Sequence, residues 1–473
     1  MAKFNTPQTN KTVNKCGHAA YKMPDKEKLV TQVLTSFFDE KKFYGDNSQE
    51  MQETIKRVIK SDPQFVANLA AFARSEFNMR SVAHVLTAYL AHEVEGKPYA
   101  RATVKAVSLR GDDVTEIMAA YLSMFGKPIP NALKKGVNDV LQGFDEYTLA
   151  KYKGEGKAVK MRDLLCLCRP TPKTKEQSEM WNRLLNDNLE TPHTWETELS
   201  AKGNNKETWE ALIDSGDVGY MATLRNLRNI LNAKPSNVNK ALSYIENPNA
   251  VRKSKQLPFR YLSAYKELGN IGGSRVFDAL ENAVEASIEN MPKLEGTTVI
   301  AVDVSGSMSS PVSANSKVQC FEIAMLLGLI ANKICDNSYF YTFNSRIEKY
   351  DVSHRSGILE TVTKARCFGG TYMHLPFEKM ISDKIKADRV IILSDNQCNG
   401  GIHTVQAYAD RYRREIGNDI WVHAIDLQGY GTQQFYGAKT NVVTGWSEKV
   451  FEFIKLAEQG EGNLVKTIEQ YHY

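Results

Sequence analysis

Two patterns of hydrophobic and polar positions divide the chain near residue 290. From about Asp25 to Asn290, apolar side chains recur at three- and four-residue intervals, as in EKLVTQVLTSFFDE, PQFVANLAAFARSEF and DDVTEIMAAYLSMFG. This spacing places them on one face of a helix. Pairs such as Asp62-Pro63 and Asp112-Asp113 are expected to open helices, and Gly, Pro and Asn separate them. We therefore predict antiparallel helices in a HEAT-like α-helical solenoid, although no fixed repeat period is visible.

From about Glu295 the pattern changes to continuous apolar runs that alternate with helical segments. The runs TTVIAVDVS, NSYFYTFNS, DRVIILSDN and IWVHAIDLQ are separated by segments such as KVQCFEIAMLLGLIANKIC. Such runs are typical of a parallel sheet that helices cover on both faces. We predict a multidomain α plus α/β protein with an N-terminal extension over residues 1–24, a helical domain over 25–290 and a Rossmann-like α/β domain over 295–473.

Side chains that carry oxygen follow two of the predicted strands. Asp303, Ser305 and Ser307 come at alternate positions where the first strand ends, and Asp395 follows the strand RVIIL. A Gly-rich loop that contains Thr371 precedes a predicted helix. The carboxyl ends of parallel strands meet at one edge of a sheet, and oxygen ligands of this kind suit Mg²⁺. We predict a divalent-cation site that prefers Mg²⁺; a turn with serine N-caps is the plainer alternative.

The same region gives little support to catalysis. VSGSM lacks the G-x-S-x-G pattern of a nucleophile elbow, and the Gly-Gly-Thr loop lacks the lysine of a Walker A motif. His374 lies close to Thr371, but a single histidine near a helix start is more often structural than a general base. A hydrolase that activates water through the metal would need an acid/base pair beside it, and the sequence offers none. We expect no enzymatic activity.

Positive charge is concentrated in the helical part. Residues 1–290 contain 41 Lys and Arg against 35 Asp and Glu, whereas residues 291–473 contain 19 against 20. Residues 151–175 hold eight of these cations against two acids, and residues 252–266 hold five cations and no acid. Lys and Arg neutralise phosphates, so we expect this part to bind nucleic acid. Ordinary solvated helix faces are the alternative interpretation.

Individual side chains in and near these clusters are candidate RNA contacts. Phe259, Tyr261 and Tyr265 are interleaved with the cations of the second cluster, and aromatic faces stack on unpaired bases. Arg225 and Arg228 are three residues apart, so they are expected to share one helix face. The candidate cations are Lys134, Lys135, Lys151, Lys157, Arg169, Arg225, Arg228 and Arg260.

Two resemblances connect these features. The set Asp303, Ser305, Ser307, Thr371 and Asp395 resembles, in this order, the metal-ion-dependent adhesion site of von Willebrand factor A domains. A helical part followed by such a domain resembles the Ro ribonucleoprotein family, whose helical part is called the TROVE domain. The stretches that carry the resemblance are FGKPIPNALKKGVNDVL, LAKYKGEGKAVKMRDLLCLCRP, GYMATLRNLRNIL and LPFRYLSAYKEL.

The Ro resemblance implies a ring of HEAT-like helices that the α/β domain closes. It implies that an outer basic surface binds small structured RNAs of the Y type. It also implies that the central hole takes single-stranded ends of misfolded or fragmentary RNAs in noncoding-RNA quality control. The resemblance places two of the family's basic RNA-contacting residues at Lys151 and Arg169. Lys157 lies near a third such position. The family commonly has His where this chain has Arg169, whose permanent charge also suits a phosphate.

A different function is open for the α/β domain. In that interpretation the metal recruits a carboxylate of a protein partner, such as an exoribonuclease, and the helices act as a scaffold.

The cysteines and the first residues predict the compartment. Seven cysteines in 473 residues do not make a disulfide framework, and Cys166 and Cys168 alternate with leucines as buried small side chains would. The stretch MAKFNTPQTNK lacks the apolar core of a secretion signal, and no apolar run reaches the ~18 residues of a membrane span. We expect a cytoplasmic protein without a membrane partner.

Overall fold

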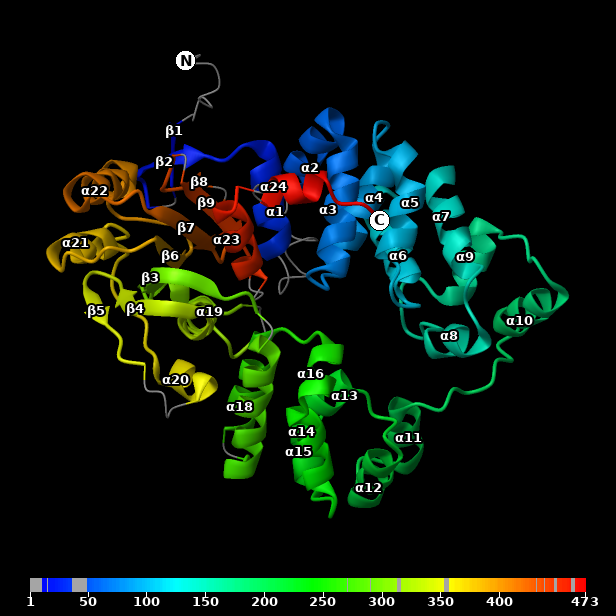
Figure 1. The fold of residues 1–473 in the computed structure, drawn as a ribbon. Helices are drawn as coiled ribbons and strands as arrows, with labels where there is room; N and C mark the ends of the chain where they lie inside the picture. The colour runs from blue at the N-terminus through cyan, green and yellow to red at the C-terminus, as the bar shows by residue number, and fades with distance from the viewer. Residues whose placement is uncertain are drawn as a thin grey trace. The chain divides into compact units, whose positions relative to one another are not determined.

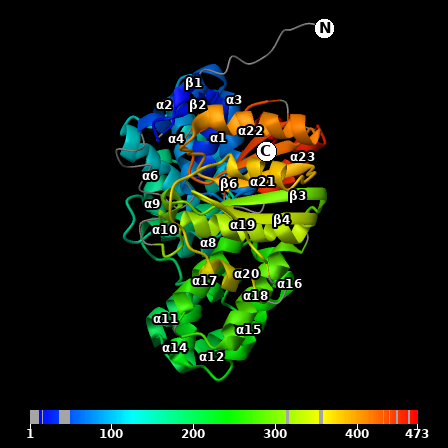
Figure 2. The same cartoon turned by 90° about the vertical axis from the view of Figure 1, so that its left-hand side faces the viewer.

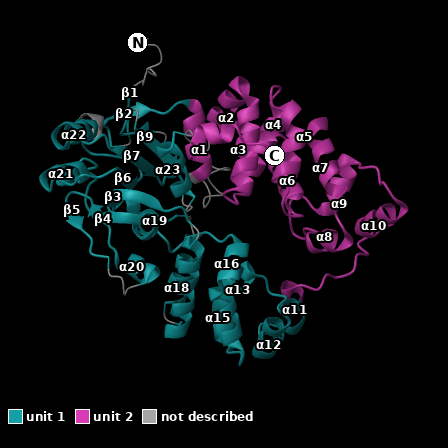
Figure 3. Cartoon of the chain, in the orientation of Figure 1, with its two compact units in different colours: residues 1–24, 198–463 teal, residues 25–197, 464–473 magenta. Residues whose placement is uncertain are grey.

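Two compact units make up the chain (Figure 3). One, here called the helical unit, contains residues 25–197 and 464–473; the other, the α/β unit, contains residues 1–24 and 198–463. Their division falls inside α11 (Trp195–Lys202), so the α/β unit includes several helices of the predicted helical domain. The domain limits drawn from the sequence stay a prediction. The computed structural model describes residues 11–14, 16–35, 49–269, 271–289, 291–312, 316–352, 357–430, 432–437, 439–445, 449–460 and 464–473.

A largely parallel sheet forms the centre of the α/β unit. Within the described residues its strand order is β5-β4-β3-β6-β7-β9. All neighbours are parallel except β5, which pairs antiparallel with β4 and adds an edge that the sequence analysis missed. The strands are β3 (Leu294–Asp303), β4 (Cys335–Phe343), β5 (Ile347–Lys349), β6 (Arg389–Ser394), β7 (Trp421–Asp426) and β9 (Thr440–Thr444).

Helices cover both faces of this sheet, as predicted (Figures 1 and 2). One face packs against α21 (Leu375–Ser382) and α22 (Gly401–Ile416), the other against α19 (Cys320–Ile334) and α23 (Val450–Glu458). The remaining helices of the unit are α12 (Lys206–Ser215), α13 (Tyr220–Arg225), α14 (Leu227–Ala233), α15 (Val238–Glu246), α16 (Pro248–Ser254), α17 (Pro258–Leu268), α18 (Ser274–Ile288) and α20 (Ile358–Lys364).

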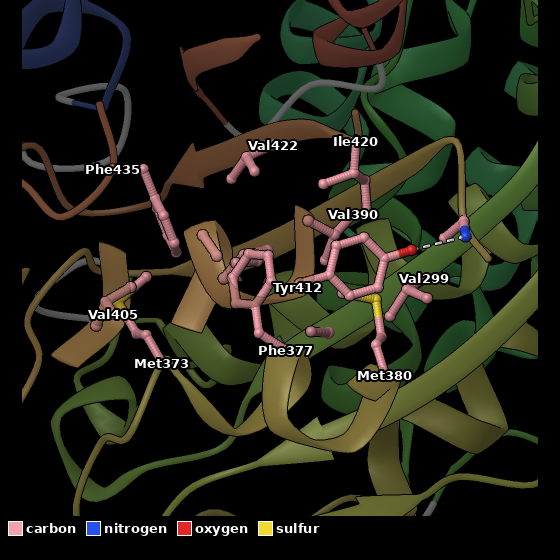
Figure 4. Packing of buried hydrophobic residues seen from close by; sticks show 14 of the residues in the cluster. Val299, Met373, Phe377, Met380, Val390, Val405, Tyr412, Ile420, Val422 and Phe435 are labelled. Carbon is pink, nitrogen blue, oxygen red and sulfur yellow. Dashed lines mark hydrogen bonds between the residues drawn. The ribbon is translucent and has the colours of Figure 1, made fainter. Parts of the chain in front are cut away.

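Tyr412 lies in the hydrophobic core between α22 and the sheet. Figure 4 shows its ring near Val299 and Phe377, and its hydroxyl points to the backbone beyond α21. The hydroxyl donates to the carbonyl of Ile385 (2.9 Å) and accepts from the amide of Ala387 (3.0 Å). A buried tyrosine needs such partners, and here they fix the chain just before β6.

The N-terminal residues take part in the α/β unit. Strands β1 (Lys11–Val13) and β2 (Ala19–Lys22) form a hairpin, and β2 pairs antiparallel with β8 (Thr432–Gln433). We predicted an N-terminal extension over residues 1–24, and within its described residues the structure adds this hairpin. Strands of two to four residues are too short for a periodic pattern to reveal them.

The helical unit is built from consecutive helices that pack on their neighbours, as the periodicity predicts. No helix in the described part of the chain is long and apolar enough to cross a membrane. The helices of this unit are α1 (Asp25–Thr35), α2 (Gln49–Ser61), α3 (Pro63–Ser75), α4 (Ser81–His92), α5 (Lys97–Val107), α6 (Asp113–Phe125), α7 (Asn131–Leu141), α8 (Glu146–Lys151), α9 (Met161–Cys168), α10 (Lys175–Leu185) and α24 (Leu464–Glu469).

The two predicted helix starts behave differently. Asp62 caps α3, because its Oδ1 accepts a hydrogen bond from the amide of Phe65 (3.0 Å), and Pro63 occupies the first helical position. At α6, Asp112 makes no side-chain cap. Its neighbour Asp113 is instead a fully buried carboxylate in the helix packing.

Asp113 joins α3, α4 and α6 through charged hydrogen bonds. Its carboxylate lies 2.9 Å from Arg74, 2.9 Å from Arg80 and 3.1 Å from Nε2 of His84, and it accepts from the amide of Arg110 (2.8 Å). Burial would raise the pKa of Asp113, but His84 and the two arginines lower it well below its usual range. The carboxylate therefore stays ionised inside the helical unit.

Replacing Asp113 with Asn should destabilise the helical unit by about 3–5 kcal/mol, because it leaves buried Arg74 without its anion. Because the pKa is lowered on folding, the wild-type stabilisation is present above about pH 4 and is lost as the pH falls. Hydrogen exchange of the α3, α4 and α6 amides in a urea series between pH 3 and 7 measures both effects.

Asp139→Asn is the matched control, since Asp139 forms an exposed pair with Arg101 (2.6 Å). An exposed pair contributes at most about 1 kcal/mol. Equal losses in the two variants would show that the Asp113 cluster does not stabilise the unit.

Candidate metal centre and basic surfaces

The carboxyl ends of β3, β6 and β7 form the edge of the sheet that carries the candidate ligands. After β3 the chain builds β4 on one side and then crosses to β6 on the other, so β3 ends at a topological switch point. Asp303 is the last residue of β3 and Asp395 directly follows β6. The paired strands place Ser394 beside Asp303, and its hydroxyl donates to Asp303 Oδ2 (2.6 Å).

The loop after β3 turns its hydroxyls back towards Asp303. The amide of Ser305 donates to Asp303 Oδ1 (2.9 Å), and the hydroxyl oxygens of Ser305 and Ser307 are 3.1 Å apart. Asp303 and Ser305 are fully buried, whereas Ser307 is exposed. The pattern D-x-S-x-S thus combines a buried carboxylate with one buried and one accessible hydroxyl.

Backbone hydrogen bonds join this loop to the loop before α21, which contains Thr371. The amide of Gly306 donates to the carbonyl of Gly369 (2.9 Å), and the amide of Phe368 donates to the carbonyl of Val304 (2.8 Å). Gly369 has φ +81°, and an added Cβ would lie 2.9 Å from a serine hydroxyl. Only glycine fits this close approach without strain.

The loop after β6 is tied to Thr371 as well. The amide of Thr371 donates to Oδ1 of Asn399 (2.9 Å), and the amide of Asn399 donates to the carbonyl of Thr371 (2.9 Å). Asp395 Oδ1 accepts from the amide of Gln397 (3.0 Å). The three loops that carry the five predicted ligands are therefore held together, and Thr371 and Asp395 are both buried.

The electrostatics of this edge favour a cation. Burial raises the pKa of Asp303, the charge of Asp395 raises it further, and hydrogen bonds from Ser305 and Ser394 oppose both effects. Two buried carboxylates that repel each other are unfavourable unless a positive charge lies between them.

The donor set fits a hard divalent cation. Asp303, Ser305, Ser307, Thr371 and Asp395 offer oxygen only, which suits Mg²⁺. Within the described ranges, no three acidic, histidine or cysteine side chains are grouped closely enough to hold a metal by themselves, so the hydroxyls would be necessary ligands. When bound there, Mg²⁺ would neutralise the carboxylates and offer a remaining coordination position to water or to an oxygen of a partner.

Three residues near this edge were missed in the sequence. Asp426 ends β7 as Asp303 ends β3; burial raises its pKa to about 7, and the charge of Asp395 also raises it. The position of Asp426 at the end of a predicted strand could have indicated it in the sequence. In the N-terminal hairpin, Asn14 Nδ2 donates to the carbonyl of Cys398 (3.0 Å). Burial and the charges of Asp395 and Asp303 raise the pKa of the Cys16 thiol, and no sequence signal indicated this proximity.

The rim of the candidate site is aromatic. Phe368 and Tyr372, which flank the Thr371 loop, are 51% and 36% exposed. The guanidinium carbon of Arg346 lies 5.7 Å from the centre of the Phe368 ring. A ligand of the metal would therefore meet an apolar surface beside a positive charge.

The helical unit contains the candidate cations of the first cluster. Lys134 and Lys135 lie on α7, Lys151 ends α8, and Arg169 follows α9 in a left-handed conformation (φ 50°). Burial raises the pKa of Cys168, beside Arg169, to about 11, and the charge of Lys134 opposes this, so α7 and α9 bring Lys134 close to the end of α9. Lys135, Lys151 and Arg169 are exposed.

Lys157 is engaged in an ion pair. Its ammonium lies 3.1 Å from the carboxylate of Glu116 on α6, and its side chain is 62% exposed. An exposed pair of this kind is weak, so an RNA phosphate can compete with Glu116 for Lys157.

The α/β unit contains the other three candidate cations. Arg225 ends α13 and Arg228 lies on α14, which starts after Asn226, so the prediction of one shared helix face is wrong. Arg228 pairs with Glu267 (2.5 Å). Burial lowers the pKa of Arg260 and the charge of Arg225 lowers it further, so these two cations lie close together.

Two expectations about side-chain exposure are wrong. Phe259 and Tyr261 are fully buried, and Tyr265 is half-buried with its ring 4.6 Å from that of Phe277. The first two rings belong to the α17 core and cannot stack on a base. Of the two cysteines on α9, Cys168 is buried as predicted but Cys166 is exposed.

Comparison with known protein families identifies both parts of the chain. The TROVE domain model matches residues 22–188 and 186–272. The Ro60 vWA domain model matches residues 297–426. Together these matches bear out the order of domains that the sequence motifs predict.

Individual relatives show the same relation. The chain is 23% identical to Telomerase protein component 1 of Rattus norvegicus over 331 residues, which is 51% of this chain and 12% of that protein. It is 27% identical to the RNA-binding protein RO60 of Caenorhabditis elegans over 246 residues, which is 48% of this chain and 38% of that protein. The chain therefore aligns with well under two thirds of the length of either relative.

A solved structure shares the fold. The crystal structure of the Ro (RSR) protein of Deinococcus radiodurans superimposes with a TM-score of 0.63 at 16% identity, covering 93% of this chain and 100% of that one. Since the TROVE match alone spans more than half of the sequence, the chain belongs to the Ro family, in which a TROVE domain precedes a von Willebrand factor A domain.

Proposed function

We propose that this protein binds RNA through its TROVE part, without catalysis. The observation that carries the proposal is that all eight candidate cations lie inside the TROVE match, residues 22–272. A relative from Caenorhabditis elegans is named an RNA-binding protein. Phosphates give such binding its affinity, and the protein reads few base edges.

In the helical unit, three exposed cations support this function. Lys135, Lys151 and Arg169 leave their charged groups accessible to solvent and to phosphate. Arginine at position 169 offers two parallel hydrogen bonds to a phosphate, which lysine cannot.

In the α/β unit, the pair Arg225 and Arg260 supports the same function. Like charges at close range repel each other, and partial burial of Arg260 increases the cost. A phosphate between them would relieve this repulsion. Arg228 pairs with Glu267 and serves packing of α14 on α17 as readily as RNA.

The specific form of the proposal follows the Ro family. Small structured RNAs of the Y type would bind an outer basic surface that includes Lys151, Lys157 and Arg169. Single-stranded ends of misfolded or fragmentary RNAs would enter the central hole of a closed ring of helices. The protein would act in RNA quality control or processing in the cytoplasm.

A hairpin RNA with a single-stranded 3′ tail should bind more tightly than the same hairpin without the tail. The affinity should fall steeply with salt because counterions are released from phosphates. Lys151→Ala/Arg169→Ala should weaken binding at least about tenfold and reduce the slope of log K against log salt by roughly 1.5 to 2. Fluorescence anisotropy over a salt series measures both quantities.

Lys60→Ala/Lys97→Ala is the matched control, because it removes two exposed charges from α2 and α5, outside the cluster. It should change the slope much less. Binding weaker than the 10⁻⁴ to 10⁻⁶ M range of non-specific association would refute the proposal. If the two double variants weakened RNA binding equally, the RNA would not bind at Lys151 and Arg169.

A second function is supported by the candidate metal centre. We propose that Mg²⁺ at Asp303, Ser305, Ser307, Thr371 and Asp395 recruits a carboxylate of a protein partner, such as an exoribonuclease. The repulsion between the buried carboxylates supports a bound cation, and the exposed aromatic rim supports a partner surface. Both functions are compatible in one molecule.

Mg²⁺ should raise the unfolding temperature of the wild type, by an amount equivalent to about 2.7 kcal/mol at a hundredfold excess over Kd. Asp395→Asn should abolish this rise. Without Mg²⁺ the same variant should be at least as stable as the wild type, because one of two repelling carboxylates is removed. Calorimetric melting with and without Mg²⁺ separates the two effects.

Two further variants complete this test. Ser307→Ala should weaken Mg²⁺ binding, whereas Ser309→Ala should not, because the Ser309 hydroxyl of the same turn donates to the Gly306 carbonyl (2.7 Å). Asp303→Ala should abolish recruitment of a partner and leave RNA affinity unchanged. Loss of RNA binding in Asp303→Ala would mean that the metal centre takes part in RNA recognition, contrary to the proposal.

A further inference from the structure

Exposed apolar side chains lie beside cations at one place in the helical unit. Tyr147 on α8 is 48% exposed, and Leu109, just before α6, is 56% exposed. Each is close in sequence to a cation, Lys151 one helical turn after Tyr147 and Arg110 directly after Leu109. An aromatic ring exposed among positive charges suits a ligand that has both a flat apolar face and negative charge.

Cations and rings alternate across this surface. The ammonium of Lys151 is 5.4 Å from the centre of the Tyr147 ring and donates to the Tyr147 hydroxyl oxygen (3.3 Å). The same ammonium is 5.8 Å from the centre of the Tyr152 ring, and the guanidinium carbon of Arg110 is 5.4 Å from that ring. The order along the surface is therefore Arg110, Tyr152, Lys151 and Tyr147.

Local packing holds this arrangement in place. Asp145 caps α8 by accepting from the amide of Thr148 (2.8 Å), and the amide of Tyr152 donates to the carbonyl of Thr148 (3.0 Å). Gly111 lies directly under the Tyr152 ring, where an added Cβ would come within 2.3 Å of Cδ2. The Tyr152 ring is thus positioned before any ligand binds, which reduces the entropy lost on binding.

We propose that Tyr147 stacks on an unpaired base of bound RNA, while Lys151 and Arg110 contact the phosphates on either side of it. This inference rests on the RNA binding proposed above and specifies the chemical class that the surface takes, an unpaired nucleotide. Every base has a flat face, so stacking tolerates any sequence, whereas a duplex hides those faces. Arg110 also lies 3.1 Å from Asp112, and its side chain is 50% exposed, so a phosphate can compete for it.

The experiment compares Tyr147→Ala and Tyr147→Leu with the wild type on a hairpin RNA that has a 3′ tail. Single 2-aminopurine bases are placed at successive positions of the hairpin loop in separate RNAs, because the loop is the unpaired part that the outer surface proposed above would contact. Both variants should bind the tailed RNA roughly 5- to 100-fold more weakly, as expected for one lost base stack. The salt slope should not change, since no charge is removed, and the quenching of one 2-aminopurine position should disappear.

Tyr147→Phe keeps the ring and should bind within about twofold of the wild type. Tyr339→Ala is the matched control, because Tyr339 is a comparably exposed tyrosine (39%) on β4 in the α/β unit. Wild-type affinity in Tyr147→Ala and Tyr147→Leu, with tight binding by the wild type, would overturn this inference and leave RNA binding intact. Failure of the wild type to bind any RNA would overturn the proposed function itself.

Discussion

The burial of two carboxylates at one edge of a parallel sheet is the constraint on which the α/β unit depends. Asp303 and Asp395 follow adjacent strands, so the strand order forces them together, and burial strengthens their repulsion. The surrounding loops hold the two carboxylates in place despite their repulsion. Gly306 and Gly369 allow close backbone contact, and the amide of Ser305 and the hydroxyl of Ser394 donate to Asp303. These hydrogen bonds hold the candidate cation site in shape.

The helical unit also buries a carboxylate, but it neutralises that charge with its own side chains. Asp113 is as deeply buried as Asp303, but two arginines and a histidine neutralise it. The pKa of the two carboxylates shifts in opposite directions. His84 and the two arginines lower the pKa of Asp113, whereas burial raises the pKa of Asp303. An acid with its own cations stabilises a fold, and an acid without them is a candidate for ligand binding.

The sequence predicted the helices and strands better than it predicted which side chains are exposed. Continuous Val and Ile runs identified β3, β6 and β7, because strands buried on both faces have few polar positions, whereas β4 is aromatic and partly exposed. The candidate metal ligands were expected to lie together because strand ends converge, and hydrogen bonds join the loops that carry them. Phe259 and Tyr261 were misjudged, since helical spacing does not say which face of α17 meets the core. The surface around Tyr147 was missed because the sequence does not show that Arg110 and Gly111, which precede α6, lie against Tyr152 at the end of α8.

The N-terminal hairpin connects positions that are far apart along the chain. The hydrogen bond from Asn14 to the carbonyl of Cys398 spans 384 residues, and β2 pairs with β8. During synthesis on the ribosome, the hairpin emerges long before the strand with which it pairs. The α/β unit therefore completes its fold only after translation has passed residue 433, so its folding has a high contact order and is slow.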